Sequence, residues 1–235
     1  MRIPSSFAQM TMEFTLAILG DGSAGKSSIV QSFVDDGFKS VYKQTIGIDF
    51  HEKIADLRGK MISMRVWDVG GQSIHSDSIK QYVSASSALF LVYDVTNDES
   101  FRNLDDWVAI VVKKNKVDSS KIYLVGNKVD MIDQRQVSAD RHEQFIEENH
   151  LGGGFFMSAK TGENVLRTFY TVANTRLSLG LSDAELEHYN KVIKAHVKQS
   201  GDDEGRTEWA DRIEEEDRLA AMEAQKRQNS GCQCF

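Results

Sequence analysis

Cysteine is nearly absent from this chain of 235 residues, which holds only Cys232 and Cys234, both close to its end. A framework of disulfides and a zinc site are therefore not expected. No apolar run approaches the roughly 20 residues that cross a membrane, and the first residues lack the apolar stretch of a secretory signal. The chain is expected to be soluble and cytosolic unless its end is modified.

Positive charge is also scarce. The chain has 28 Lys and Arg against 35 Asp and Glu, for a formal net charge of −7. Without a basic field to bind a phosphate backbone, a nucleic-acid partner is not expected. Residue 2 is Arg2 rather than glycine, which excludes an N-myristoylation signal. The 40% hydrophobic content is enough for a packed core, and the length suits one domain of roughly 150–200 residues plus extra segments, or two small domains.

What the chain does contain is a glycine-rich loop, GDGSAGKS, at residues 20–27. It fits the phosphate-binding pattern of Gly, four residues, Gly, Lys, then Ser or Thr. An apolar run at 14–19 precedes it and a helical pattern at 28–34 follows. The loop is therefore expected to present backbone N–H groups and the positive end of a helix dipole to phosphates. A glycine-rich turn without a ligand is the alternative.

Individual residues of this loop have expected roles. The Lys26 ammonium can lie on the β- and γ-phosphates, and the Ser27 hydroxyl can ligate Mg²⁺. Gly20, Gly22 and Gly25 allow positive φ angles and a close backbone approach. The predicted nucleotide contacts from this segment are Gly20, Asp21, Gly22, Ser23, Ala24, Gly25, Lys26, Ser27 and Ser28.

Short apolar runs alternate with helical patterns along the chain. Strands are expected at 14–19, 46–57, 61–66, 88–93, 121–125 and 155–157, and helices at 28–34, 76–84, 99–114, 138–149 and 164–179. This alternation is typical of a parallel sheet covered on both faces, which binds its ligands at the carboxyl ends of the strands. Residues 151–154, LGGG, are interpreted as a flexible joint or as a loop that merely tolerates glycine.

The motif NKVD at 127–130 points to the base of the nucleotide. The Asp130 carboxylate can accept two parallel hydrogen bonds from the N1–H and the exocyclic amine of guanine. Adenine has no such pair of donors, so the site should reject it. We expect Asn127 and Lys128 to contact the nucleotide as well. The later motif Ser158-Ala159-Lys160 can offer a backbone N–H to guanine O6.

The stretch DVGGQ at 68–72 follows a predicted strand. Asp68 suits a direct or water-mediated role on Mg²⁺, and Thr45 can add a second hydroxyl and a backbone N–H. Gly71 can turn its N–H toward the γ-phosphate, and Gln72 can orient the attacking water. Taken alone, Thr45 and Asp68 would be ordinary strand-entry and turn residues. Together with Ser27 they form the predicted metal set.

These five motifs, in this order over about residues 13–180, resemble those of Ras-superfamily small GTPases, and TIGIDF at 45–50 resembles the first switch of Rabs. The resemblance implies a P-loop NTPase (small G-protein) α/β fold: a mostly parallel six-stranded sheet with one antiparallel edge strand and about five helices. It adds Phe38, packed on the guanine, and Tyr42 to the nucleotide contacts. It also makes Phe50, Trp67 and Tyr82 an aromatic surface for effectors, although each could instead be a core residue.

One departure from most Rabs narrows the resemblance. Most have Thr-Ala-Gly-Gln-Glu after the Mg²⁺ aspartate, whereas this chain has VGGQS at 69–73. With YKQTIG at 42–47 and LVYDVTN at 91–97, it resembles the divergent Rab subgroup numbered twenty-eight. The Gly70-Gly71 pair should leave the second switch less ordered without a γ-phosphate. Gly22 is expected to lie where a side chain would crowd Gln72 and an incoming activator.

The resemblance implies that GTP and water react to give GDP and phosphate, with Lys26, Gln72 and Mg²⁺ as the catalytic groups. No arginine is placed as an internal finger, so the intrinsic rate is expected to be low. The implied partners of the monomer are an exchange factor, a GTPase-activating protein, effectors on the switch surface, and a prenyltransferase or prenyl-binding chaperone. Two alternatives stay open: a GTP-binding scaffold with negligible hydrolysis, and an ATP-dependent P-loop enzyme.

The ends of the chain differ from its middle. Residues 1–12 are expected to be a flexible extension, 13–180 the GTPase domain, and 181–235 a charged tail. Three acid–base pairs at i,i+4 spacing favour a solvated helix in this tail. A disordered spacer and a partner-binding helix anchored by Trp209 and Ile213 are the alternatives.

The chain closes with CQCF at 232–235. Read as Cys-a-a-X with Phe last, this ending predicts geranylgeranylation of Cys232. It also resembles the Rab Cys-x-Cys ending with one trailing residue, which allows lipids on Cys232 and Cys234; an unmodified end is the third possibility. One lipid binds membranes only marginally. Attachment to the cytosolic face of endomembranes, endosomal or near the ciliary base by analogy, is therefore expected to be reversible or doubly lipidated.

Overall fold

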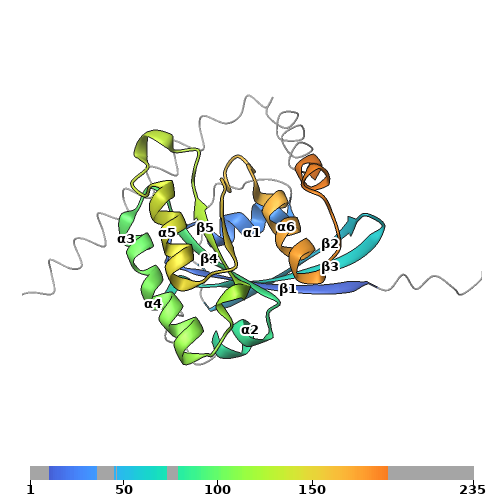
Figure 1. The fold of residues 1–235 in the computed structure, drawn as a ribbon, viewed down its shortest axis with the longest axis horizontal. Coiled ribbons are helices and arrows are strands. Elements are labelled where there is room, and N and C mark those ends of the chain that lie inside the picture. The colour runs from blue at the N-terminus through green and yellow to red at the C-terminus, as the bar shows by residue number, and fades with distance from the viewer. Residues whose placement is uncertain (1–10, 36–44, 46, 73–78, 190–235) are drawn as a thin grey trace, which may run out of the picture. The chain divides into compact units, whose positions relative to one another are not determined.

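The computed structural model describes residues 11–35, 45, 47–72 and 79–189. Its centre is a six-stranded sheet in the order β2-β3-β1-β4-β5-β6 (Figure 1). β2 pairs antiparallel with β3, and the other neighbours are parallel. The prediction of a mostly parallel sheet with one antiparallel edge strand is therefore confirmed. The strands are β1 (Met12–Gly20), β2 (Ile48–Leu57), β3 (Lys60–Val69), β4 (Ala88–Asp94), β5 (Ile122–Asn127) and β6 (Gly153–Phe156).

The labelled α-helices of the described part of the chain are α1 (Lys26–Val34), α2 (Ile79–Ala85), α3 (Asp98–Arg102), α4 (Leu104–Val108), α5 (Ala139–Asn149) and α6 (Val165–Leu177). Residues 183–189, at the end of the described part, are also helical. The single helix expected at 99–114 is divided into α3, α4 and a π-helical stretch, Ala109–Lys114. The division falls at Asn103, where the Asp106 N–H bonds the Asn103 carbonyl in a tighter, three-residue turn.

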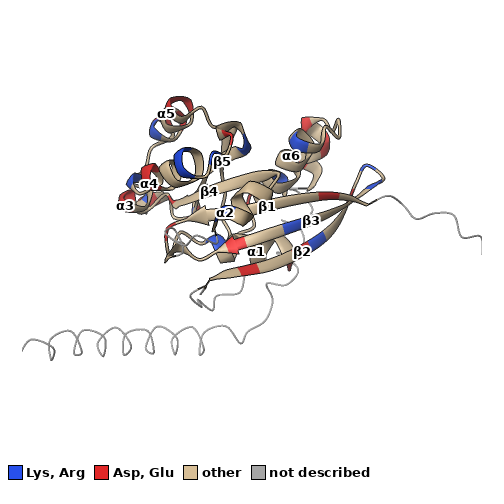
Figure 2. Ribbon diagram, turned by 90° about the horizontal axis from the view of Figure 1, so that it is seen from below, with Lys and Arg blue, Asp and Glu red and all other residues tan. Residues whose placement is uncertain are grey.

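Each face of the sheet has its own hydrophobic core. α1 and α6 cover one face, where the Phe33 and Phe169 rings stack with their centroids 3.9 Å apart. α2, α3, α4 and α5 cover the other, around Trp107 and Tyr93. Every residue of β4 is buried, as expected for a central parallel strand with both faces covered. Charged residues lie mostly on α3, α4, α5 and α6 and on β2 and β3, toward one edge of the sheet (Figure 2).

The glycine run at 151–154 is not a simple loop, because Gly153 and Gly154 belong to β6. A Cβ at Gly154 would lie 2.2 Å from Nε2 of His142 and 2.3 Å from Cδ1 of Ile146. Glycine is therefore needed there so that α5 can pack closely on the strand. The interpretation of these two positions as a joint or a tolerant loop was wrong. The first residues of the helix expected at 76–84 lie outside the described residues.

We expect the stability of the fold to depend on pH through His142. This residue of α5 is buried against the sheet, where it contacts Tyr93 of β4 and Phe156 of β6. Its side chain is 1% exposed, and its Nδ1 lies 3.0 Å from the Tyr93 hydroxyl. Burial lowers the pKa of His142 from 6.5 to about 4. The unfolded chain therefore takes up this proton first, so the free energy of unfolding falls as the pH drops from 6.5 toward 4.

The size of this effect is about 3 kcal/mol, because each pKa unit corresponds to about 1.4 kcal/mol. Urea unfolding of wild type and a His142→Leu variant at pH 7 and pH 4.5 measures it. The variant should lose most of this pH dependence, while the ordinary carboxylates still contribute in both proteins. An equal loss of stability in both proteins on acidification would contradict the prediction.

Candidate functional site

The glycine-rich loop joins the end of β1 to the start of α1, as predicted. Gly20 (φ 133°) and Gly25 (φ 88°) have positive φ angles, but Gly22 does not, and Ser23 (φ 63°) takes the third left-handed position. Gly22 therefore serves the close backbone approach that glycine allows, since a Cβ on Gly71 would lie 2.3 Å from its nitrogen. A Cβ at Gly20 would lie 2.1 Å from the Val92 carbonyl oxygen, so only glycine allows β1 this close to β4.

Lys26 begins α1 and is 5% exposed. Its ammonium donates hydrogen bonds to the carbonyl oxygens of Gly20 (2.7 Å) and Asp21 (2.6 Å). Burial lowers the pKa of Lys26 to about 8, with Asp68 and Asp21 acting in the opposite direction, so the group is mainly charged at pH 7. An ammonium has three N–H donors. Two are aimed at the loop's own carbonyls, and the third suits a phosphate oxygen.

The three residues of the predicted metal set converge from three segments. The Ser27 hydroxyl lies 2.7 Å from that of Thr45 and donates to Asp68 Oδ2. Thr45 Oγ1 is 3.4 Å from the same carboxylate oxygen. Asp68 is 1% exposed and its burial raises the pKa of the carboxyl, partly offset by the Ser27 hydrogen bond and by Lys26.

The other carboxylate oxygen, Asp68 Oδ1, is buried and has no hydrogen-bond partner among the described residues. An orphaned carboxylate oxygen beside two hydroxyls fits Mg²⁺ or a water bound to it, since Mg²⁺ prefers oxygen ligands and is held by one or two carboxylates plus phosphates. Within the described residues no three His, Cys, Asp or Glu side chains gather as a metal cage. A cation would therefore need the phosphates of a nucleotide as further ligands.

The start of the predicted second switch, Gly70 and Gly71, contacts the predicted first switch at Thr45 and Gly47 and the phosphate loop at Gly22. The Gly70 N–H donates to the Gly47 carbonyl (2.9 Å), and a Cβ at Gly70 would lie 2.5 Å from the Thr45 carbonyl oxygen. A Cβ at Gly71 would lie 2.3 Å from the Gly22 backbone nitrogen. Two glycines are thus required for this backbone approach.

Gln72 follows this glycine pair and is exposed. The crowding expected between Gly22 and Gln72 is not found at the Cβ position, since a Cβ on Gly22 would meet no described atom within 4 Å. The close contact instead involves Gly71, whose packing against the Gly22 backbone is not visible in the loop motif alone. Whether an activator would be crowded stays a prediction.

The loops predicted to hold guanine meet the phosphate loop. Asn127 is 1% exposed; its amide donates to the Ala24 carbonyl (2.9 Å) and accepts from the Ala159 N–H (3.1 Å). Asp130 Oδ1 accepts a hydrogen bond from the Ser158 hydroxyl (2.6 Å). Lys160 follows on the same loop and is exposed. Asn127 therefore joins the phosphate loop to the Ser158-Ala159-Lys160 motif, as the sequence predicted for a shared nucleotide site.

Sequence reasoning missed Asp94, which ends β4 and is 6% exposed. It forms an ion pair with Lys128 (2.6 Å), which has a positive φ of 67°. Asp94 therefore helps hold the loop that carries Asp130. Its position in the sequence, as an acidic residue at the end of a predicted parallel strand, could have indicated a place near the site.

The predicted effector aromatics do form one cluster at the sheet edge. The ring centroids are 4.7 Å apart between Phe50 and Trp67, and 4.9 Å between Trp67 and Tyr82. Phe50 is 48% exposed, so its role is not that of a buried core residue. Phe38, Tyr42, Cys232 and Cys234 lie outside the described residues.

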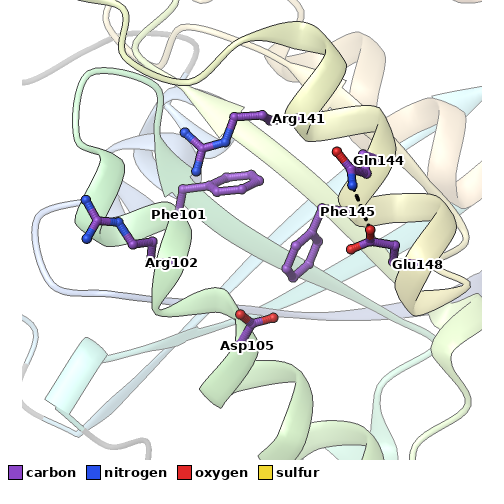
Figure 3. A pocket seen from close by; sticks show the side chains of 7 residues that line it. All are labelled: Phe101, Arg102, Asp105, Arg141, Gln144, Phe145 and Glu148. Atoms are coloured by element: carbon purple, nitrogen blue, oxygen red, sulfur yellow. Dashed lines mark hydrogen bonds between the residues drawn. The ribbon is translucent and has the colours of Figure 1, made fainter.

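A separate groove of about 230 Å³ lies between α3–α4 and α5 (Figure 3). The Phe101 and Phe145 rings meet across it, with centroids 5.5 Å apart. Its two arginines, Arg102 and Arg141, pair with the same carboxylate, that of Asp98, which offsets only one of their two positive charges. None of the predicted nucleotide residues lines it. In the parts of the chain that are described, no helix has the length and apolar character to span a membrane.

Comparison with known proteins agrees with this geometry. The model of the Ras family matches residues 15–178. Ras-related protein Rab-28 of Caenorhabditis elegans is 39% identical over 77% of this chain and 74% of its own length. Rab-4 of Dictyostelium discoideum is 35% identical, over 79% and 92% of the two chains, and human Rab-3A is 38% identical, over 66% and 70%. The chain therefore belongs to the Ras superfamily of small GTPases, as a member of the Rab family that resembles Rab-28.

Proposed function

We propose that this Rab-family GTPase is a GTP–GDP switch with a low intrinsic rate of hydrolysis, whose Mg²⁺ is held by Ser27, Thr45 and Asp68. The observation that carries the proposal is the convergence of these three side chains, with an orphaned oxygen on Asp68, beside the buried Lys26. Such a constellation suits phosphoryl transfer, in which catalysis is mostly positioning and charge stabilisation.

Each group of the proposed site has its own role in hydrolysis. Bound Mg²⁺ would neutralise charge on the β- and γ-phosphate oxygens. Lys26 would add its positive charge to the same oxygens, and the N–H groups at the start of α1 would face the phosphates. Gln72 would orient a water for in-line attack on the γ-phosphorus. The P–O bond to the β-phosphate breaks, GDP leaves, and the water's proton ends on the released phosphate.

Gln72→Leu is expected to slow single-turnover phosphate release by tenfold or more, because leucine has no group that can orient water. The wild-type rate should be on the order of 10⁻⁴ to 10⁻³ s⁻¹, as in unassisted Ras. GDP affinity should stay within about twofold, since the nucleotide contacts are kept. Gln136→Leu, a change of the same type at an exposed residue, is the control. Hydrolysis by Gln72→Leu at the wild-type rate would remove Gln72 from the mechanism.

We also propose that the C-terminal Cys232 and Cys234 carry the membrane anchor. The proposed partners are an exchange factor, an activating protein, and a prenyltransferase or prenyl-binding chaperone. Effectors would bind at Phe50, Trp67 and Tyr82. Endosomal or ciliary-base membranes are the proposed location. The ending CQCF supports the anchor, and the aromatic cluster, in which Phe50 is 48% exposed, supports the effector surface.

Mass spectrometry of the protein isolated from its own cells tests the anchor. One geranylgeranyl group on Cys232, or one on each cysteine, is expected. The variant in which both cysteines are replaced by serine should stay in the soluble fraction after cell lysis. An intact, unmodified terminus on membrane-bound protein would contradict the proposal.

A further inference from the structure

The Asp21 carboxylate of the phosphate loop accepts hydrogen bonds from the α3–α4 region. Its Oδ2 accepts a hydrogen bond from the Asn103 amide (2.6 Å), and its Oδ1 accepts one from the Trp107 indole N–H (3.0 Å). Both donors lie more than 80 residues further along the chain. The contacts therefore join two distant segments of the fold.

Both donors are placed by the fold. Trp107 lies in α4 and is 0% exposed, within the core that covers this face of the sheet. Asn103 occupies the break between α3 and α4, where its backbone N–H bonds the Glu99 carbonyl. A buried indole N–H needs an acceptor. The Asp21 carboxylate supplies it, so each group limits the movement of the other.

The backbone carbonyl of Asp21 faces Lys26, the proposed catalytic lysine. The Asp21 carbonyl accepts a hydrogen bond from the Lys26 ammonium at 2.6 Å. A Cβ on Gly71 would lie 2.7 Å from the Asp21 carbonyl carbon, so the second switch also rests on this peptide. The orientation of the Asp21 peptide thus determines where Lys26 directs its remaining N–H and where Gly71 lies.

We propose that Asn103 and Trp107 are positioning residues for the phosphate loop, which hold the Asp21 carboxylate and thereby fix the Asp21 carbonyl that aims Lys26. The inference rests on the proposed nucleotide site. Because the α3–α4 donors never touch the nucleotide, their loss should change nucleotide retention and hydrolysis through the loop alone.

The experiment compares GDP release and single-turnover GTP hydrolysis in the full-length wild type, Trp107→Phe, Asn103→Ala and Asp21→Ala. Trp107→Phe keeps an aromatic ring in the core and removes only the N–H donor. Losing a hydrogen bond to a charged acceptor should speed GDP release by about tenfold and slow hydrolysis by a similar factor. Combining Trp107→Phe with Asp21→Ala should add nothing to Asp21→Ala alone, since the two act through one contact.

The matched control is Tyr93→Phe. Tyr93 lies in the same core and is also 0% exposed, and the change removes its hydrogen bond to His142. It should lower the melting temperature about as much as Trp107→Phe but leave GDP release within about twofold. Equal acceleration in both variants would show a general loss of stability and overturn the proposal.

Two further outcomes would distinguish a failure of the positioning role from a failure of the proposed function. Wild-type GDP release in Trp107→Phe and Asn103→Ala would overturn the positioning role while leaving the proposed nucleotide site intact. A wild-type protein that binds neither GDP nor GTP would instead remove the proposed function itself.

Discussion

Replacing Asp130 by asparagine is expected to weaken GDP binding by roughly 10²- to 10⁴-fold, because two hydrogen bonds to a charged acceptor are lost. An asparagine amide offers one acceptor and one donor, and its NH₂ would face a donor of guanine. Xanthine carries a carbonyl in place of the exocyclic amine, so the same NH₂ could donate to it. The variant should therefore prefer xanthosine diphosphate to GDP.

The fold should survive this change. Asp130 follows β5, and its contact with the Ser158 hydroxyl can be kept by the asparagine oxygen. Titration of both nucleotides and ADP into wild type and variant measures the switch in preference. Asp133→Asn, which removes the same charge from an exposed residue three positions later, is the control and should bind like wild type. Undiminished GDP binding by Asp130→Asn would contradict the assignment of this loop to guanine.

Asp68→Asn is expected to have two opposite effects. Removing the carboxylate should lower Mg²⁺ affinity by about 10- to 100-fold, as changes beside a metal typically do. The nucleotide-free protein should at the same time become more stable at pH 7. Burial raises the pKa of Asp68, so the folded state holds this proton more tightly than the unfolded chain does. The free energy of unfolding then falls as pH rises above the ordinary Asp pKa of 3.8, and the variant escapes this cost.

The Mg²⁺ dependence of GDP release, together with urea unfolding of the nucleotide-free protein at pH 4 and pH 7, tests both effects. The variant should gain stability over wild type at pH 7 and much less at pH 4. Asp105→Asn, at an exposed position on α4, should change neither quantity. An unaltered Mg²⁺ requirement in Asp68→Asn would show that this carboxylate does not serve the metal.

The sequence was sufficient for those parts of the site that lie in short, contiguous motifs. The phosphate loop and the NKVD motif follow from local patterns, because a strand–loop–helix unit determines where its own loop lies. The mostly parallel sheet with one antiparallel edge strand was implied by the resemblance and is confirmed. The convergence of Ser27, Thr45 and Asp68 could be expected from the resemblance, and their contacts place them together.

The remaining features depend on contacts between distant segments. The Gly22 backbone packs against Gly71, which lies in a distant segment of the chain, and the left-handed angle of this turn falls on Ser23. Position 154 in β6 requires glycine because His142 and Ile146 of α5 occupy the space that a Cβ would fill. The bonds of Asp21 to Asn103 and Trp107 link residues that no local pattern relates.

The central claim is that this chain hydrolyses GTP, and GTP specifically, at the site built around Lys26 and Asp68. Single-turnover phosphate release by the full-length protein with Mg²⁺, from GTP and from ATP in parallel, tests it most directly. Phosphate release from GTP is expected on the order of 10⁻⁴ to 10⁻³ s⁻¹, with none above background from ATP. Equal release from ATP, or tight GTP binding with no release at all, would contradict it.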